Sequence, residues 1–187
     1  VDSGAMYRGV TLYALDRNWI SEDHFETEKL IDSLSAIHLE FKKENSNEKA
    51  EIHLNGINVE EKIRSMKVSE FVSQIAAIPE IRRKLVKMQH EIGKEKGVVM
   101  DCRDIGTVVF PDAELKIVMT AKPETRASRR FKELSTKGDE ISFEEVFDNV
   151  KERDHLDSTR KDSPLKKADD AIEVDNSEMN LEDQFHI

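Results

Sequence analysis

Two mainly apolar runs in the second half of the chain constrain its fold more than any other feature. The segments "GVVMDC" (97–102) and "LKIVM" (115–119) lack the regular alternation of apolar and polar residues that marks a strand with one solvent-exposed face. A third short strand, "DAIEVD", is predicted at 170–175. Helical patterns lie between them, near 123–136 and 143–157. Buried strands that are joined by helices are typical of a parallel sheet with both faces covered. The sequence therefore predicts an α/β fold.

The first half of the chain follows a different pattern. Residues 36–43 and 50–59 alternate apolar and polar side chains, which predicts half-buried antiparallel strands. Asn55-Gly56 predicts a tight hairpin because both residues tolerate positive φ, and the polar stretch 44–49 predicts a second turn. Helices are predicted on either side of these strands, at 4–18, 23–33, 68–78 and 80–96.

A chain of 187 residues suits one domain that carries an inserted lobe. We expect a core built from 1–35 and 66–187, with a lid at about 126–160, and a β-rich insertion at 36–65. Three clear parallel strands would leave long sheet edges unpaired, which is unusual in a stable domain. We therefore expect the sequence to be a fragment of a longer chain.

The overall composition excludes several classes of protein. The formal net charge of −10 argues against a broad electrostatic grip on a nucleic-acid polymer or an anionic membrane. No window approaches the roughly 18 apolar residues that a membrane span needs. Cys102 is the only cysteine, which excludes an internal disulfide and leads us to expect a reducing, cytoplasmic location. The histidines are scattered, so we expect no structural metal site.

The arginines occur in short clusters although the chain as a whole is acidic. The clusters include Arg8, Arg82 with Arg83, Arg103, Arg126 with Arg129 and Arg130, and Arg153 with Arg160. Guanidinium groups match phosphate oxygens, so these clusters are suited to a small anion. Surface arginines that balance 39 acidic residues are the alternative, and composition alone leaves both interpretations open.

Two of these clusters have an informative position. Arg103 and Asp104 follow the predicted strand Val98–Asp101, and ligands of open α/β sheets bind at the carboxyl ends of strands. An arginine there can bind phosphate and an aspartate can accept from an amino group, although both residues could instead cap neighbouring helices.

The second cluster, Arg153, Asp157 and Arg160, has the spacing i, i+4, i+7 and shares one helical face. That face could close over a charged substrate, or its residues could simply form salt bridges. At the other end of the chain, "DSGAMYR" places Ser3, Tyr7 and Arg8 at a helix start, a position that favours anions.

Five segments taken together point to a family. "DSGAMYR", "SQIAAIPEIR", "DCRDIGTVVFPDA", "ETRASRR" and "KERDHLDSTR" occur in an order and spacing that closely resembles the bacterial cytidylate kinases, over nearly all of the 187 residues. The resemblance implies a P-loop nucleoside-monophosphate-kinase fold whose β-rich insertion enlarges the monophosphate-binding lobe. It implies a monomer that transfers the γ-phosphoryl group of ATP to CMP or dCMP with Mg²⁺.

The resemblance also assigns roles to residues that match the family's motifs. Those that would recognise the cytosine edge are Ser3, Arg82 and Asp104. Those that would hold the α-phosphate are Arg8, Arg103 and Arg160, and those that would hold the ribose are Ser73, Arg153 and Asp157. Tyr7 belongs to the same substrate site. The residues expected to stabilise charge on the transferring group are Arg103, Arg153 and Arg160. Those expected near the lid on the ATP side are Arg126, Arg129 and Arg130.

Two features depart from the family pattern. The Gly-x-x-x-x-Gly-Lys-Ser/Thr loop, which cradles ATP phosphates, does not occur in these 187 residues, whereas in the family it precedes "DSGAMYR". We therefore expect this chain by itself to have little or no kinase activity, and the alternative function is a module that binds nucleotides without phosphorylating them. Cys102 stands where the family usually has glycine. A UMP kinase is a further alternative, which Asp104 disfavours because uracil presents a carbonyl where cytosine presents an amine.

Overall fold

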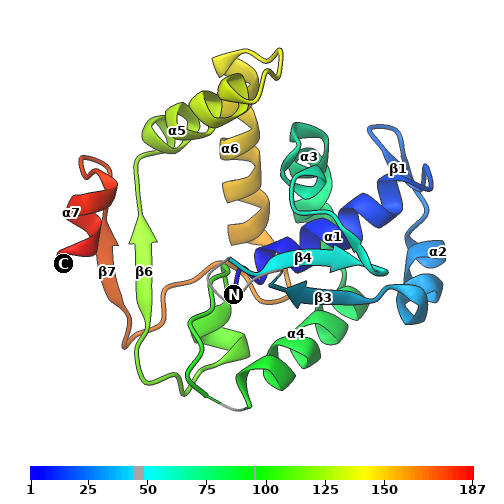
Figure 1. Ribbon diagram of the computed structural model, residues 1–187, viewed down its shortest axis with the longest axis horizontal. Coiled ribbons are helices and arrows are strands. Elements are labelled where there is room, and N and C mark those ends of the chain that lie inside the picture. The colour runs from blue at the N-terminus through cyan, green and yellow to red at the C-terminus, as the bar shows by residue number, and fades with distance from the viewer. Residues whose placement is uncertain (44–48, 95) are drawn as a thin grey trace.

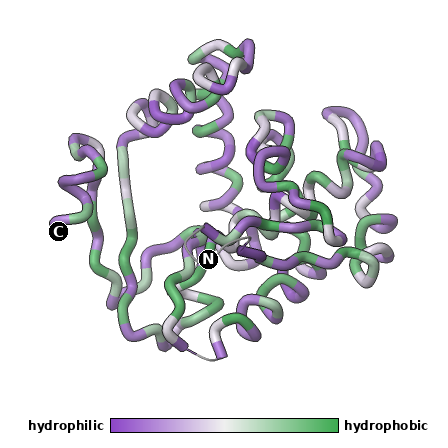
Figure 2. Tube along the Cα trace, viewed as in Figure 1, coloured by the Kyte–Doolittle hydropathy of each residue, from purple (hydrophilic) through white to green (hydrophobic). Residues whose placement is uncertain are grey.

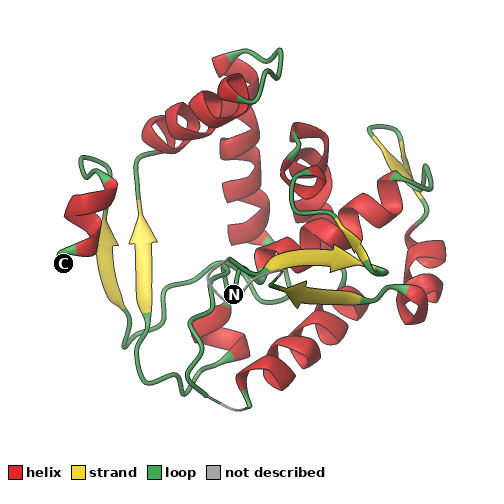
Figure 3. Cartoon of the chain, in the orientation of Figure 1, coloured by secondary structure: helices red, strands yellow, loops and turns green. Residues whose placement is uncertain are grey.

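The computed structural model describes residues 1–43, 49–94 and 96–187 (Figures 1 and 3). The helices are α1 (Gly4–Leu15), α2 (Thr27–Asp32), α3 (Met66–Ala76), α4 (Pro79–Gly93), α5 (Pro123–Thr136), α6 (Phe143–Thr159) and α7 (Leu181–Phe185). The strands are β1 (Ile20–Ser21), β2 (His24–Phe25), β3 (Leu39–Lys42), β4 (Glu51–Leu54), β5 (Ile57–Asn58), β6 (Ile117–Thr120) and β7 (Ile172–Asp175). None of the helices in the described ranges is long and apolar enough to cross a membrane.

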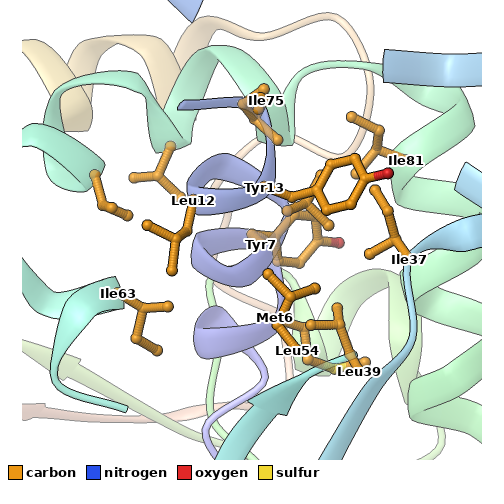
Figure 4. Packing of buried hydrophobic residues seen from close by; sticks show 14 of the residues in the cluster. Met6, Tyr7, Leu12, Tyr13, Ile37, Leu39, Leu54, Ile63, Ile75 and Ile81 are labelled. Atoms are coloured by element: carbon orange, nitrogen blue, oxygen red, sulfur yellow. The ribbon is translucent and has the colours of Figure 1, made fainter. Parts of the chain in front are cut away.

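Helix α1 is the centre of the main hydrophobic core. Nine of its twelve residues are buried, and it packs against α3 and β4 (Figures 1 and 4). Gly9 allows this close packing, because a Cβ atom there would lie 2.8 Å from a methyl group of Leu39. Side chains of α1, β3, β4, α3 and α4 form one continuous cluster, which includes Met6, Ile52, Ile75 and Leu85. The core therefore fixes the first residues of α1 against the start of α4.

The predicted hairpin at Asn55-Gly56 is confirmed. Strands β3, β4 and β5 form an antiparallel sheet, and the two turn residues have φ values of 50° and 82°. The turn predicted at 44–49 falls largely on residues 44–48, outside the described residues. Leu39 and Leu54 pack into the same cluster as α1. The division into a core and an insertion at 36–65 stays a prediction.

The strand predicted at 97–102 is wrong. Only Asp101 pairs there, in a single parallel bridge with Asp2, and Val99 is 87% exposed. The backbone of this segment bonds to residues 1–3 over too short a length to make a strand: Asp101 N donates to Val1 O, and Ser3 N to Asp101 O, both at 3.1 Å. An apolar run forms a strand only where a neighbouring strand satisfies its backbone groups.

The other two predicted strands do form a parallel pair, β6 and β7, with Ile117 opposite Ile172. The expectation that helices cover both faces of this sheet is wrong. Both isoleucines are more than half exposed, and the pair stands apart from α1 and carries both hydrophobic and hydrophilic residues (Figures 1 and 2). Within the described residues, each strand has one neighbour only.

The helices of the second half are confirmed as α5 and α6, and those predicted at 4–18, 68–78 and 80–96 as α1, α3 and α4, with ends shifted by a few residues. The helix predicted at 23–33 begins only at Thr27, because residues 20–25 form the small hairpin β1–β2.

Helix α6 starts with a capping box in which the Ser142 hydroxyl accepts from Glu145 N at 3.2 Å. A second cluster, centred on Ala127, Leu134 and Val146, joins α5 to α6.

We predict that Leu134→Ala destabilises the chain by about 2–4 kcal/mol, because it empties part of the small α5–α6 cluster, where Leu134 is fully buried. Urea unfolding followed by circular dichroism measures this loss. Leu181→Ala is the matched control, since Leu181 on α7 is 86% exposed and its truncation leaves the unfolding free energy unchanged. Equal losses in the two variants would contradict the packing described here.

Candidate functional site

A cavity of about 270 Å³ opens where α1, α3, α4, α6 and the segment after Asp101 meet. Six arginines from five separate parts of the chain line it: Arg8, Arg64, Arg82, Arg103, Arg153 and Arg160. Only two carboxylates, Asp2 and Asp157, share that lining. The cavity is therefore cationic, although the protein carries a net charge of −10.

The structure brings together most of the residues that the sequence singled out for substrate binding. Those that line the cavity are Tyr7, Arg8, Ser73, Arg82, Arg103, Arg153, Asp157 and Arg160. Ser3 and Asp104 are fully buried behind this lining. The Ser3 hydroxyl donates to Asp101 O at 3.0 Å, and Asp104 pairs with Arg82.

A buried ion pair joins Arg82, which lines the cavity, to Asp104. The two side chains are 3% and 1% exposed, and Arg82 Nη1 also donates to Ala76 O at 3.1 Å. Arg82 Nε and Asp104 Oδ1 have no hydrogen-bond partner among the described residues. Unpaired polar atoms at buried positions are costly, so a donor and an acceptor left free side by side point to a ligand or to bound water.

Asp157 lies among the arginines of the cavity. It is buried, pairs with Arg103 Nε, and lies 3.5 Å from Arg160 Nη1. Arg153 Nε and Arg160 Nη2 are buried without a hydrogen-bond partner in the part of the chain that the structure describes. Arg8 Nη1 donates to Ile63 O at 3.1 Å and to Ser69 Oγ at 3.0 Å. Both expected uses of this face are therefore present: it forms salt bridges, and it presents free donors to the cavity.

The arginines of the cavity destabilise one another's charge. Burial, followed by the charges of Arg130, Arg103 and Arg64, lowers the pKa of Arg8 to about 10. Burial together with Arg103 and Arg8 lowers the pKa of Arg153 to about 9. Both groups keep their charge at neutral pH, but at a cost in free energy. A dianion such as a phosphate monoester would offset that cost.

Arg64 is a cavity residue that the sequence analysis missed. Its guanidinium group is held by Glu60 Oε1 at 2.5 Å and by Asp2 Oδ2 at 3.1 Å. The i, i+4 spacing of Glu60 and Arg64 could have predicted the ion pair between these two residues. The second partner, Asp2, lies 62 residues away along the chain. Nothing in the sequence pattern indicated that these two segments meet.

Three arginines that were expected near the lid lie outside the cavity lining. Arg126 forms a two-pronged pair with Asp154, at 2.9 and 2.6 Å, which ties α5 to α6. Arg129 Nη2 donates to Asn176 O at 2.6 Å. Arg130 binds Glu133 at 2.7 Å and donates to the backbone oxygen of Arg64. Their role toward ATP stays a prediction.

A cluster of cationic groups together with a buried Arg–Asp pair suits the cavity to a nucleoside monophosphate, the acceptor of the nucleoside-monophosphate kinases. Comparison with known proteins narrows this class: the family described as "Cytidylate kinase" matches residues 1–186. The cytidylate kinase of Flavobacterium psychrophilum is 56% identical over 187 residues, all of this chain and 83% of that protein. That of Bacteroides thetaiotaomicron is 53% identical over 184 residues, 98% of this chain and 80% of that protein. The chain therefore belongs to the cytidylate kinase family, which phosphorylates CMP and dCMP with ATP.

Cys102 lines the same cavity and gives a pH-dependent prediction. Burial, followed by the nearby charge of Asp104, raises the pKa of the Cys102 thiol. The thiolate is the reactive form, so alkylation of the folded chain should begin at higher pH than alkylation of a free cysteine. Iodoacetamide reaction rates across a pH series measure this shift.

The urea-unfolded chain is the reference in that experiment, because Cys102 is the only cysteine. A midpoint in the folded chain equal to or below that of the unfolded chain would contradict the burial described for this thiol.

Proposed function

We propose that this cavity is the CMP or dCMP acceptor site of the kinase. The observation that carries the proposal is the convergence of guanidinium groups from distant segments on one cavity, with buried donor atoms left unpaired. The phosphate is assigned to Arg8, Arg103 and Arg160, which line the cavity.

The base is assigned to the buried Arg82–Asp104 pair. The free Oδ1 of Asp104 is an acceptor for the cytosine 4-amino group, and the free Nε–H of Arg82 is a donor for N3 or O2. Ser3 is assigned to the same base site, where its hydroxyl donates to Asp101 O. Uracil would place a carbonyl against the acceptor of Asp104, which leaves two acceptors facing each other and disfavours UMP.

The ribose is assigned to Ser73, Arg153 and Asp157. The Ser73 hydroxyl is buried, lines the cavity and has no hydrogen-bond partner within the described ranges. A hydroxyl without a partner and a carboxylate on the facing helix α6 are suited to the donors and acceptors of a sugar. Tyr7 lines the same cavity.

The chemistry assigned to the site is attack of a CMP phosphate oxygen on the γ-phosphorus of ATP. Such a transfer needs no enzyme nucleophile, and positioning together with stabilisation of the spread negative charge supplies the rate. Arg103, Arg153 and Arg160 are the groups placed to stabilise that charge. Our assignment of Arg126, Arg129 and Arg130 to the ATP side would require them to exchange their present protein partners for phosphate oxygens.

We propose that Mg²⁺ accompanies ATP and neutralises part of its phosphate charge. The carboxylates do not fit a metal site of their own, because Asp2 and Asp157 in the cavity lining and Asp104 behind it are each paired with an arginine. We therefore assign no protein side chain as a ligand of Mg²⁺. A monomeric state, a cytoplasmic location and low turnover by these 187 residues alone stay predictions.

The phosphate assignment predicts that Arg103→Gln weakens CMP binding by about 10- to 100-fold, the effect of losing a charge-assisted hydrogen bond. Cytidine lacks the phosphate, so its affinity should be unchanged. Titration calorimetry of both ligands measures the difference. Arg103 is partly exposed, so its replacement spares the core.

Arg83→Gln is the matched control, because Arg83 is an exposed arginine of α4 that pairs with Glu80 and does not line the cavity. If Arg103→Gln weakens CMP and cytidine equally, or leaves CMP affinity at the value of the control, the phosphate does not lie where it is assigned.

A further inference from the structure

The segment that carries Asp104 ends against the last turn of α4. Residues Ile105–Val109 form a single π-helical turn, and Phe110 N closes it by donating to Ile105 O at 2.7 Å. The backbone oxygen of Asp104 begins this turn, because it accepts from Val108 N at 2.9 Å. π-Helical turns are rare and occur often at functional sites. The turn therefore connects Asp104 to Phe110 as one compact unit.

Two residues of α4 hold the far end of this turn. His90 Nε2 lies 2.8 Å from Val109 O, and because a carbonyl oxygen can only accept, this ring nitrogen carries the proton and donates. The rings of His90 and Phe110 meet edge to face, with centres 5.7 Å apart. Gly93 makes room for the Phe110 ring, since a Cβ atom on this glycine would lie 2.5 Å from Phe110 Cζ. We call these interactions of His90 and Gly93 with Val109 and Phe110 the distal contact.

Arg82 holds the near end of the same turn. Its side chain pairs with Asp104, and Arg82 Nη1 donates to Ala76 O at 3.1 Å. Arg82 and Gly93 are eleven residues apart, which places them on one face of α4. A single helix thus binds the turn at both ends, through an ion pair at Asp104 and through the distal contact.

We propose that the distal contact is a positioning element for base selection. An ion pair alone leaves the Asp104 carboxylate free to turn about its side-chain bonds, whereas a backbone that is fixed at both ends sets the direction of the carboxylate. His90 and Gly93 do not line the cavity, so they act through Asp104. The inference rests on the proposed function, because it assumes that Asp104 accepts from the 4-amino group of cytosine.

A purely structural role for the distal contact would have a different signature. Loss of a contact that serves stability alone would weaken the binding of CMP and UMP by the same factor. Misdirection of Asp104 changes the ratio of the two affinities, because only cytosine gains from a well-directed acceptor.

The test is titration calorimetry of CMP and UMP with the full chain carrying His90→Phe, His90→Gln or Gly93→Ala. Phenylalanine keeps an aromatic ring and removes the donor to Val109 O. His90→Phe should therefore reduce the preference for CMP over UMP by about fivefold, the effect of one neutral hydrogen bond. His90→Gln should keep the preference of the unmodified chain, because the glutamine amide supplies an N–H donor. His90 is an exposed residue, so its replacement spares the core.

Gly93→Ala tests the other half of the distal contact. The added methyl group would displace the Phe110 ring. Alanine favours a helix over glycine by about 1 kcal/mol, so the exchange itself does not weaken α4. We expect the preference for CMP to fall while the helical circular dichroism is retained, which reports a shift of the turn rather than damage to the helix.

His24→Phe is the matched control. His24 is an exposed histidine of β2 that pairs with Glu26 and does not line the cavity. Its replacement also removes a polar contact, but it should keep the preference of the unmodified chain.

The outcomes are distinguishable. If the unmodified chain prefers CMP and either His90→Phe or Gly93→Ala keeps that preference within about twofold, the inference is wrong while the proposed function stands. Equal losses in His90→Phe and His90→Gln would also overturn it, since the hydrogen bond would then not be the cause. If the unmodified chain does not distinguish CMP from UMP, the proposed base assignment fails and the inference fails with it. Should Gly93→Ala not fold, the two variants of His90 decide by the same criteria.

Discussion

The ion pairs of Asp157 hold the cationic cavity together. This buried carboxylate sits between Arg103, on the segment after Asp101, and Arg160, at the end of α6. Without it, several guanidinium groups would face one another in a partly desolvated space, and their repulsion would separate α6 from the α1 core. One negative charge inside a cluster of positive charges leaves an excess that an incoming phosphate can balance. Asp157 thus reduces the repulsion between the arginines in the folded chain, and it leaves an excess of positive charge in the cavity that a bound phosphate can balance.

The rest of the architecture serves to place these charges. Helix α1 brings Tyr7 and Arg8 to the cavity by burying its other faces, and α4 begins at Pro79 so that Arg82 falls inside its first turn. Helix α6 carries Arg153 and Asp157, Arg160 follows its last residue with an extended backbone, and the Leu134 cluster holds α6 to α5. Arg130 of α5 then contacts the backbone of Arg64. Segments that are far apart in sequence meet at the cavity because each is anchored by apolar contacts elsewhere.

What the sequence predicted well depends on local interactions. The helical face of α6 and the hairpin at Asn55-Gly56 follow from spacing and from backbone conformations that few other residues adopt. The strand at 97–102 failed because strand formation depends on a neighbour, and an apolar run does not specify where its partner lies. Arg64 was missed for a related reason, since its second partner is Asp2 at the far end of the chain. Arg126 was recognised as part of a motif, but its pairing with Asp154 joins two helices and has no local signal.

The central claim is that nucleotide phosphate joins guanidinium groups that are already gathered in one cavity. Nuclear magnetic resonance of the arginine Nε–H groups during addition of CMP tests this most directly, with signals assigned by single arginine-to-lysine variants. The account predicts that the signals of Arg8, Arg103 and Arg160 shift together with CMP, that cytidine leaves them in place, and that the exposed Arg83 is silent in both cases. Shifts of the same size with cytidine, or no shift of these three signals with CMP, would contradict it.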